Sequence, residues 1–214
     1  MTNLSAEKTA KEISNLLKVY KMTNNHNILP FMPFYFIRHG ETDWNRRNII
    51  MGSKDIPLNE LGFKQAHEAS RILKNENFEV IVSSPRIRAQ QTAEIIAKKT
   101  NKPIVFEEGL TEIVWGEAEG TTFDPTKSIF DDAHRPRGAE TFLAFQGRVV
   151  KTIASVLLMK KLPLIVSHGG VFKALTHSMG YKDLSSANCT PFFFKPPFDS
   201  THPWVVCSLG EEEL

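Results

Sequence analysis

Residues 34–45 read Phe34-Tyr35-Phe36-Ile37-Arg38-His39-Gly40-Glu41-Thr42-Asp43-Trp44-Asn45. The first four side chains are aromatic or β-branched, which is typical of a strand buried on both faces of a sheet. The apolar run then stops, and Arg38 and His39 lead into a glycine turn. Ligands of open α/β sheets bind at the carboxyl ends of the strands, and the planar donor fork of arginine suits phosphate oxygens. This stretch therefore predicts a strand that carries an anion-binding and reactive pair of side chains to the edge of a sheet.

The composition favours one globular domain. The chain has 214 residues, of which 41% are hydrophobic, and this is enough for one sizeable core. A formal charge of +2 with dispersed basic residues argues against a nucleic-acid or anionic-membrane partner. No run approaches the ~20 apolar residues of a membrane span, and no signal-peptide core is seen, so we expect a cytoplasmic protein. Cys189 and Cys207 are expected to be buried, reduced thiols. The oligomeric state is left open.

Strands that lead directly into helices recur along the chain. Residues 79–84 form a short buried run that ends in Ser-Pro and opens a helix, and residues 162–167 form another that leads into His168. Asn59 is expected to cap a helix that runs to about residue 74 with Phe63 on its buried face. Alternating strands and helices predict an α/β three-layer sandwich with a mostly parallel central sheet flanked by helices. The apolar runs at 191–195 and 204–209 are expected to be edge strands of this sheet.

Two segments stand apart from this pattern. Residues 1–32 are expected to be an N-terminal extension, a short amphipathic helix within 6–20 followed by a loop, that serves either for packing or for interaction. The single domain would then cover residues 33–214. Within it, residues 121–137 are turn-rich and are expected to form a small substrate-covering excursion. Its Arg135 and Arg137 either bind a second anionic group of a substrate or merely flank a turn.

A set of motifs in this sequence resembles that of the histidine phosphatase superfamily, the phosphoglycerate mutase-like enzymes. The matching segments are Arg38-His39-Gly40-Glu41-Thr42 with Trp44-Asn45, Ser83-Ser84-Pro85 through Arg88-Ala89 to Gln91-Thr92-Ala93, Leu110-Thr111-Glu112, and Ser167-His168-Gly169-Gly170. They occur in the family's order over roughly residues 33–180. The resemblance implies the phosphoglycerate mutase-like fold. It also favours the phosphatase branch, since the excursion at 121–137 is shorter than in the glycolytic mutases.

The resemblance implies a role for six residues. His39 would be the nucleophile that forms a phosphohistidine, and Glu112 would protonate the leaving group and later activate water. His168 would assist at the reacting phosphoryl group. The remaining phosphate ligands would be Arg38, Asn45 and Arg88. Arg86 stands where the family more often has an aliphatic residue, so its role is open.

The histidines give little indication of a metal site. None of the seven forms an H-x-H or H-x-x-x-H pair, and no C-x-x-C accompanies them. Fixed arginine charges near His39 and His168 would also repel a cation. We therefore predict that the chain uses neither a metal ion nor another cofactor.

These observations predict a metal-independent phosphomonoester hydrolase that acts on a small phosphorylated substrate through a phosphohistidine intermediate. One alternative is a cofactor-dependent phosphoglycerate mutase, in which the same intermediate passes its phosphoryl group to a sugar-acid hydroxyl. Another is a non-catalytic phospholigand-binding module. That module is disfavoured because His39, Glu112 and His168 are all retained. The sequence does not define the natural substrate.

Overall fold

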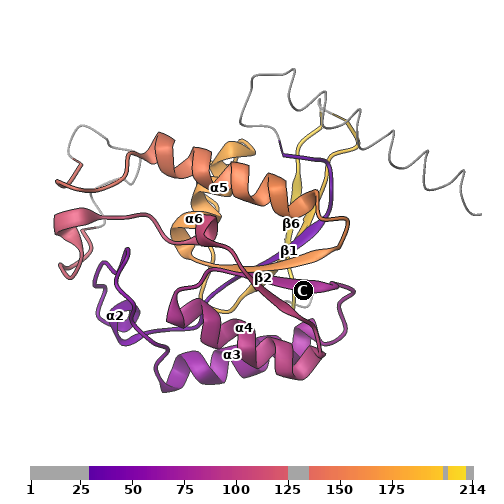
Figure 1. Ribbon diagram of the computed structural model, residues 1–214, viewed down its shortest axis with the longest axis horizontal. Helices are drawn as coiled ribbons and strands as arrows, with labels where there is room; N and C mark the ends of the chain where they lie inside the picture. Colours follow the sequence, from indigo (N-terminus) through magenta and orange to yellow (C-terminus); the bar gives the residue numbers. More distant parts are fainter. Residues whose placement is uncertain (1–28, 125–134, 200–201, 211–214) are drawn as a thin grey trace, which may run out of the picture.

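The computed structural model describes residues 29–124, 135–199 and 202–210 (Figure 1). The helix expected within residues 6–20 lies outside the described residues. So does most of the excursion expected at 121–137. The role of the N-terminal extension and the domain boundaries therefore stay predictions.

A six-stranded sheet forms the centre of the molecule, with strand order β3-β2-β4-β1-β5-β6. Strands β3, β2, β4 and β1 are mutually parallel, while β5 runs antiparallel to both β1 and β6. The mostly parallel sheet is thus confirmed. The strands are β1 (Phe34–Arg38), β2 (Val80–Ser83), β3 (Ile104–Phe106), β4 (Pro163–Ser167), β5 (Pro191–Lys195) and β6 (Val205–Ser208).

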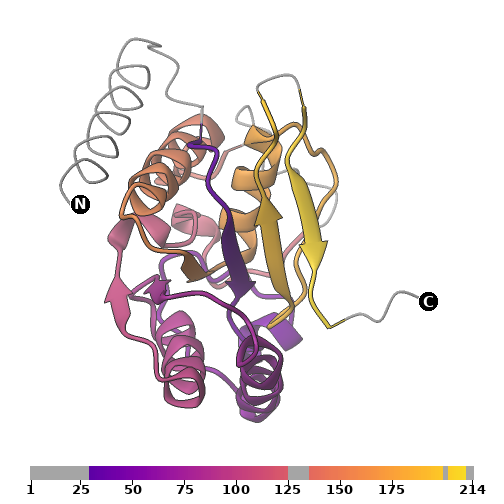
Figure 2. The ribbon, with the colours of Figure 1, turned by 90° about the vertical axis from the view of Figure 1, so that its right-hand side faces the viewer.

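The position expected for β5 is wrong. Only β6 is an edge strand at this end of the sheet, because β5 lies between β1 and β6 and is paired on both sides (Figure 2). The physical reason is the antiparallel return of the chain through β6, which covers the free edge of β5. That pairing brings Phe193 opposite Cys207, which is exposed, whereas Cys189 is buried. Both thiols are free, so the expected reduced state is confirmed and the expected burial of Cys207 is wrong.

Helices cover both faces of the sheet, which confirms the three-layer sandwich. Figure 1 shows α5 and α6 on one face and α3 and α4 on the other. A short helix α2 follows β1, and two 3-10 turns, η1 and η2, follow β3. Their bounds are α2 (Asp43–Arg46), α3 (Glu60–Leu73), α4 (Ile87–Thr100), η1 (Glu108–Leu110), η2 (Gly116–Ala118), α5 (Phe142–Leu157) and α6 (Gly169–Ser178). Among the described residues, no helix has both the length and the apolar character needed to cross a membrane.

The continuous apolar run of β1 is explained by a core on each face. Phe34 and Phe36 belong to the cluster under α5 and α6, whereas Tyr35 and Ile37 belong to the cluster with α3 and α4. Successive strand side chains point to opposite faces, so a central strand must be apolar at every position. A fully buried phenylalanine contributes about 1.5–3 kcal/mol relative to an exposed one. This burial fixes β1, and with it the polar turn at its carboxyl end.

Helix α3 packs closely against the turn that follows β1. Asn59 caps it as expected, since its side-chain oxygen accepts a hydrogen bond from the Gly62 N–H at 2.8 Å. The prediction for Phe63 is wrong, because that side chain is 39% exposed while Gly62 is buried. A Cβ on Gly62 would lie 2.1 Å from the backbone oxygen of Glu41. The helix therefore packs through its glycine against the segment after His39, and this orientation turns Phe63 outward.

Candidate active site

His39 and His168 lie side by side at the carboxyl ends of two neighbouring strands. Strands β1 and β4 are parallel, and the His39 N–H donates a hydrogen bond to the Ser167 carbonyl at 2.9 Å. The centroids of the two imidazole rings are 5.2 Å apart. The rings are buried, with exposed fractions of 1% and 0%. The convergence that the motifs predict from positions far apart in sequence is present.

The contacts of His39 define which of its ring nitrogens carries the proton. Its Nδ1 lies 2.7 Å from the carbonyl oxygen of Gly40. A carbonyl oxygen can only accept, so Nδ1 carries the proton and Nε2 keeps its lone pair. Burial lowers the pKa of His39 well below its ordinary value, and the charges of Arg88 and Arg38 lower it further. The imidazole is therefore neutral at neutral pH and has a free lone pair on Nε2.

The backbone around His39 is held from several sides. The Gly40 N–H donates to the Thr92 hydroxyl at 3.1 Å, and a Cβ at this glycine would lie 2.5 Å from the backbone oxygen of Gly62. On the other side, the Asn188 amide donates to the His39 carbonyl at 2.8 Å. The Cys189 N–H donates to the carbonyl of Arg38. The histidine is thus presented by a rigid turn.

His168 is placed at the N-cap position of α6. Its Nε2 lies 2.8 Å from the hydroxyl oxygen of Ser84, which follows β2. Its Nδ1 is buried and has no hydrogen-bond partner among the described residues. Burial lowers the pKa of His168 well below its ordinary value, and the charges of Arg88, of His39 when protonated, of Arg38 and of Arg86 act in the same direction.

A fully buried guanidinium group, that of Arg88, and a partly buried one, that of Arg38, lie next to the histidines. Arg88 is fully buried, and its terminal nitrogens donate to the carbonyl oxygens of Lys54 at 2.7 Å and Gly52 at 3.0 Å. Burial lowers its pKa to about 10, while the carboxylate of Glu112 acts in the opposite direction. Arg38 donates from Nη1 to the Ser186 carbonyl at 2.9 Å. Carbonyl oxygens thus orient both forks without neutralising their charge.

Buried polar atoms without partners gather in this region. Within residues 29–124, 135–199 and 202–210 they are Arg38 Nε, Arg86 Nε, Arg88 Nε, His168 Nδ1 and Ser186 Oγ. A buried donor that lacks a partner costs about 1–3 kcal/mol. An anion with several oxygens, such as a phosphoryl group, would satisfy donors of this kind and offset the excess positive charge.

Arg86, whose role the sequence left open, belongs to the surroundings of this cluster. It is the N-cap residue of α4, and its N–H lies 3.3 Å from the hydroxyl oxygen of Ser84, the same hydroxyl that contacts His168. Its charge lowers the pKa of Arg88 and that of His168. A third guanidinium group therefore adds to the positive potential at the edge of the sheet.

Glu112 is brought to the same place by the N-terminus of α6. Its Oε2 accepts a hydrogen bond from the Gly170 N–H at 3.0 Å, and its Oε1 accepts one from the Ile113 N–H at 3.0 Å. A Cβ on Gly170 would lie 2.2 Å from Oε1, so a larger residue at this position would displace the carboxylate. Burial lowers the pKa of both Arg38 and Arg88, and the Glu112 carboxylate acts in the opposite direction on each. Its hydrogen bond from Gly170 therefore ties it to the helix that follows His168, and its charge acts on the two guanidinium groups.

Asn45 has a local structural role at the start of α2. Its Oδ1 accepts from the Thr42 N–H at 3.2 Å and from the Thr42 hydroxyl at 3.1 Å, in a capping box. Among the described residues, it makes no hydrogen bond with the other five predicted site residues. A contact between Asn45 and phosphate stays a prediction. Of the two arginines in the excursion, Arg137 has a side chain that is 89% exposed and lies 3.8 Å from a Glu117 oxygen.

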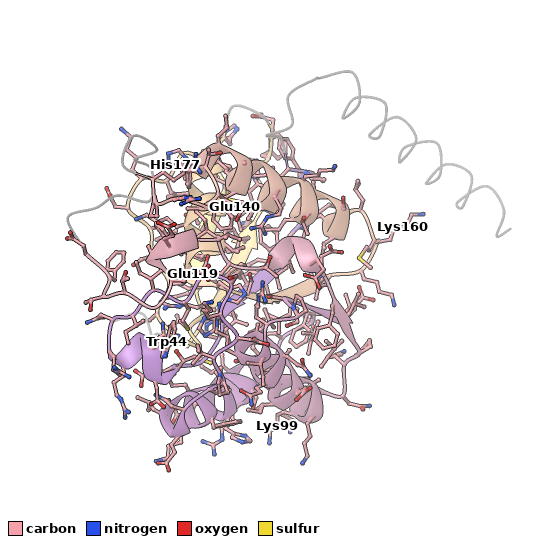
Figure 3. The ribbon with its side chains drawn as sticks, turned by 60° about the vertical axis from the view of Figure 1, so that its left-hand side comes forward. Trp44, Lys99, Glu119, Glu140, Lys160 and His177 are labelled. Atoms are coloured by element: carbon pink, nitrogen blue, oxygen red, sulfur yellow. The ribbon has the colours of Figure 1, made fainter. Side chains whose placement is uncertain are left out.

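Glu119 has a structural role that supports Arg88. Its carboxylate accepts hydrogen bonds from the Ser53 N–H at 2.8 Å, the Ser53 hydroxyl at 2.6 Å and the Trp115 N–H at 3.1 Å. Burial raises the pKa of Glu119, but these hydrogen bonds outweigh burial and the net shift is downward. Glu119 therefore fixes the loop whose carbonyls hold the Arg88 fork. Figure 3 shows Glu119 on the same side of the molecule as Trp44 and Glu140.

Sequence reasoning missed four residues that shape the site: Ser84, Glu140, Arg148 and Asn188. Arg148 left a signal, since it lies three positions after Phe145 and beside Val149 on the apolar stripe of α5, where a solvated arginine is not expected. Ser84 lies inside a motif in which the arginine alone suggests phosphate binding. Asn188 precedes β5 in a segment without any pattern, and nothing in its neighbourhood points to His39.

The sequence was compared with known proteins. The family described as "Histidine phosphatase superfamily (branch 1)" matches residues 34–192. The uncharacterized phosphatase PhoE of Bacillus subtilis is 38% identical over 141 residues, which cover 65% of this chain and 72% of that protein. A probable phosphoglycerate mutase, GpmB of Yersinia pestis, is 34% identical over 148 residues, covering 63% and 68%.

The fold was also compared with solved structures. A phosphoserine phosphatase from Entamoeba histolytica, in complex with 3-phosphoglyceric acid, superposes with a TM-score of 0.69. It is 26% identical in sequence, and the match covers 85% of this chain and 98% of that one. Together with the family match over most of the described residues, which adds the assignment to branch 1, this confirms what the motifs predicted: the chain belongs to the histidine phosphatase superfamily.

Proposed function

We propose that this chain hydrolyses small phosphate monoesters through a phosphohistidine formed at His39, without a metal ion. One observation carries the proposal. A neutral imidazole with a free Nε2 lone pair is buried beside guanidinium and imidazole nitrogens that have no partner among the described residues. A phosphoryl group supplies both things that this cluster lacks, an electrophile for Nε2 and acceptor oxygens for the unpaired donors.

In the first step, Nε2 of His39 attacks phosphorus and the bond between phosphorus and the ester oxygen breaks. The electron pair stays on the departing oxygen, which takes a proton from Glu112. The phosphoryl group passes from oxygen to nitrogen with little covalent help, so most of the rate must come from positioning and from neutralised charge. Arg38, Arg88 and His168 each have a buried nitrogen, without a partner in the described part of the chain, that can supply it.

In the second step, water attacks the phosphohistidine. Glu112, now ionised, takes a proton from that water, the phosphorus–nitrogen bond breaks, and inorganic phosphate and neutral His39 are released. A positioned acid and base typically contributes roughly 10²- to 10⁴-fold to such a rate. The same carboxyl group thus serves as the acid in the first step and as the base in the second.

The comparisons support a second candidate, a phosphoglycerate mutase. The Yersinia pestis relative is named as a probable enzyme of this kind, at 34% identity. The mutase would use the same phosphohistidine and differ only in the acceptor, a sugar-acid hydroxyl in place of water. We prefer the hydrolase because the Bacillus subtilis relative, named as a phosphatase, is more similar at 38% identity.

The test is a phosphate-release screen over sugar phosphates, nucleotides, phosphoglycerates and phosphopeptides, run with and without a chelator. We expect turnover that the chelator does not change and that His39→Ala abolishes. His67→Ala is the matched control, because this histidine lies on the exposed side of α3. A phosphoryl label on the protein that survives base but not acid would identify the phosphohistidine.

Different outcomes of this screen would support other functions or contradict part of the proposal. Isomerisation of phosphoglycerate that exceeds phosphate release would establish the mutase. Phosphate binding without turnover on the whole panel would establish the binding module. Loss of turnover with chelator would contradict the metal-free reaction, which stays a prediction. The cytoplasmic location expected from the sequence also stays a prediction.

A further inference from the structure

Arg148 holds the segment that carries Glu112. Its Nη1 donates to the carbonyl oxygens of Gly109 at 3.1 Å and Thr111 at 2.9 Å, and its Nη2 lies 3.4 Å from the carbonyl oxygen of Glu112 itself. The guanidinium carbon lies 5.1 Å from the centre of the Phe145 ring. One side chain of α5 thus contacts three carbonyl groups in the stretch from η1 to Glu112.

Glu140 completes the arrangement from the other side. Its two carboxylate oxygens accept hydrogen bonds from Arg148, from Nε at 3.2 Å and from Nη2 at 2.8 Å. One of these oxygens also accepts from the Val114 N–H at 3.0 Å, and the Glu140 N–H donates back to the Val114 carbonyl at 2.9 Å. The ion pair is largely shielded from water, with side-chain exposures of 26% and 24%. The ion pair therefore forms hydrogen bonds with the backbone on both sides of Glu112.

We propose that Arg148 and Glu140 are positioning residues that hold the carboxylic acid of Glu112 in line with the leaving group. This inference rests on the function proposed above. Within the described part of the chain, the hydrogen bonds of the Glu112 carboxylate come from two backbone N–H groups, those of Ile113 and Gly170. The direction of its side chain therefore depends on the backbone, and the backbone between residues 109 and 114 depends on the ion pair.

The planar fork of arginine suits this task, since it reaches carbonyl oxygens and a carboxylate at once, whereas a lysine offers a single point charge. The effect on the reaction is expected to be large. A displacement of about 1 Å in a catalytic group can lower a rate about 10²-fold. A purely structural ion pair would have a different effect, because it would change the amount of folded enzyme and not its preference among leaving groups.

The test uses two substrates with the same phosphoryl group. An alkyl phosphate needs a proton on its departing oxygen, whereas a nitrophenyl phosphate can lose its oxygen without one. We expect Arg148→Met to lower kcat/KM on the alkyl ester at least about 10-fold more than on the aryl ester, as part of the roughly 10²- to 10⁴-fold effect of a general acid. The ratio of the two values does not depend on the fraction of protein that is folded.

Three variants make the result specific. Glu112→Gln must show the same preferential loss on the alkyl ester, because it removes the acid itself. Glu140→Gln, which weakens the ion pair and keeps an acceptor for Val114, should show a smaller loss in the same direction. Val149→Ala is the matched control: its side chain is fully buried beside Arg148 on α5, and its loss should be equal on both esters.

The outcomes separate this inference from the proposed function. An equal loss on both esters in Arg148→Met, with preferential loss in Glu112→Gln, would overturn the positioning role and leave the hydrolase intact. Equal losses in both variants would overturn the acid role of Glu112 and the positioning role together. A restored alkyl-to-aryl ratio in Arg148→Lys would contradict the need for a planar fork.

Discussion

The buried histidines are expected to make the fold sensitive to mild acid. Burial, and then the charge of Arg88, lower the pKa of His39 and of His168 well below their ordinary values. The unfolded chain regains a histidine pKa of about 6.5 and so binds more protons than the folded chain below that pH. The contribution of the two neutral histidines to the free energy of unfolding is therefore complete above about pH 6.5. It is lost as the pH falls toward the pKa values that the histidines have in the folded chain.

We expect the midpoint of thermal unfolding to drop steeply between about pH 6.5 and 5, the range in which unfolded histidine becomes protonated. Each unit of pKa difference corresponds to about 1.4 kcal/mol of unfolding free energy. Calorimetry across this range checks the expectation. His168→Gln should flatten the dependence, whereas His67→Ala, on the exposed side of α3, should keep the wild-type slope. An unchanged slope in His168→Gln would show that this histidine does not cause the sensitivity.

Single residues also show where sequence reasoning ends. His39, Arg88 and His168 could be placed near one another because each lies in a short motif at the end of a predicted strand or at the start of a helix, whereas Glu112 was assigned only through the family resemblance. The place of Arg148 on the apolar stripe of α5 marks it as unusual, but its role could not be predicted, because that role depends on carbonyl groups of a segment that is folded irregularly. Hydrogen bonds from a side chain to distant backbone groups leave no periodic pattern in the sequence.

At the scale of elements, the contact between α3 and the turn after β1 requires a glycine. A Cβ at position 62 would lie 2.1 Å from the backbone oxygen of Glu41, so Gly62→Ala must displace either the helix or the turn that carries His39. Inserting atoms into a well-packed site typically costs about 1–3 kcal/mol. We expect urea unfolding to show a loss of this size, together with lower activity.

Gly147 offers a matched comparison on α5. A Cβ there would meet no atom within 4 Å. Because alanine is a better helix former than glycine, Gly147→Ala should raise the free energy of unfolding by about 0.5–1 kcal/mol. If Gly62→Ala behaved like Gly147→Ala, the close approach of α3 to the turn would not limit stability.

For the whole molecule, alternating strands and helices were enough to predict the layered architecture. They did not predict where β5 lies or which way it runs. Its apolar residues are consistent with either direction, and the antiparallel pairing with β1 depends on how the chain returns after α6. The position of β5 matters for the site, because the segment that leads into it supplies Ser186 and Asn188 to the strand that presents His39.

The site joins parts of the chain that are otherwise separate, so a bound anion should stabilise the molecule as a whole. Arg38 ends β1, Arg88 lies on α4 and His168 caps α6, and each has a buried nitrogen without a partner among the described residues. Inorganic phosphate that bridges these nitrogens binds the folded chain only. At about 100 times its dissociation constant it should add about 2.7 kcal/mol to the free energy of unfolding.

Thermal unfolding with increasing phosphate, at ionic strength held constant with chloride, measures this effect. We expect the midpoint to rise with phosphate in the wild type and in His67→Ala, and to rise far less in Arg88→Met, which removes a buried guanidinium group. Phosphate should also weaken the acid sensitivity described above, since a bound anion favours protonated histidines. An equal rise in Arg88→Met would mean that phosphate binds elsewhere, and the cluster around His39 would then lose its role as the anion site.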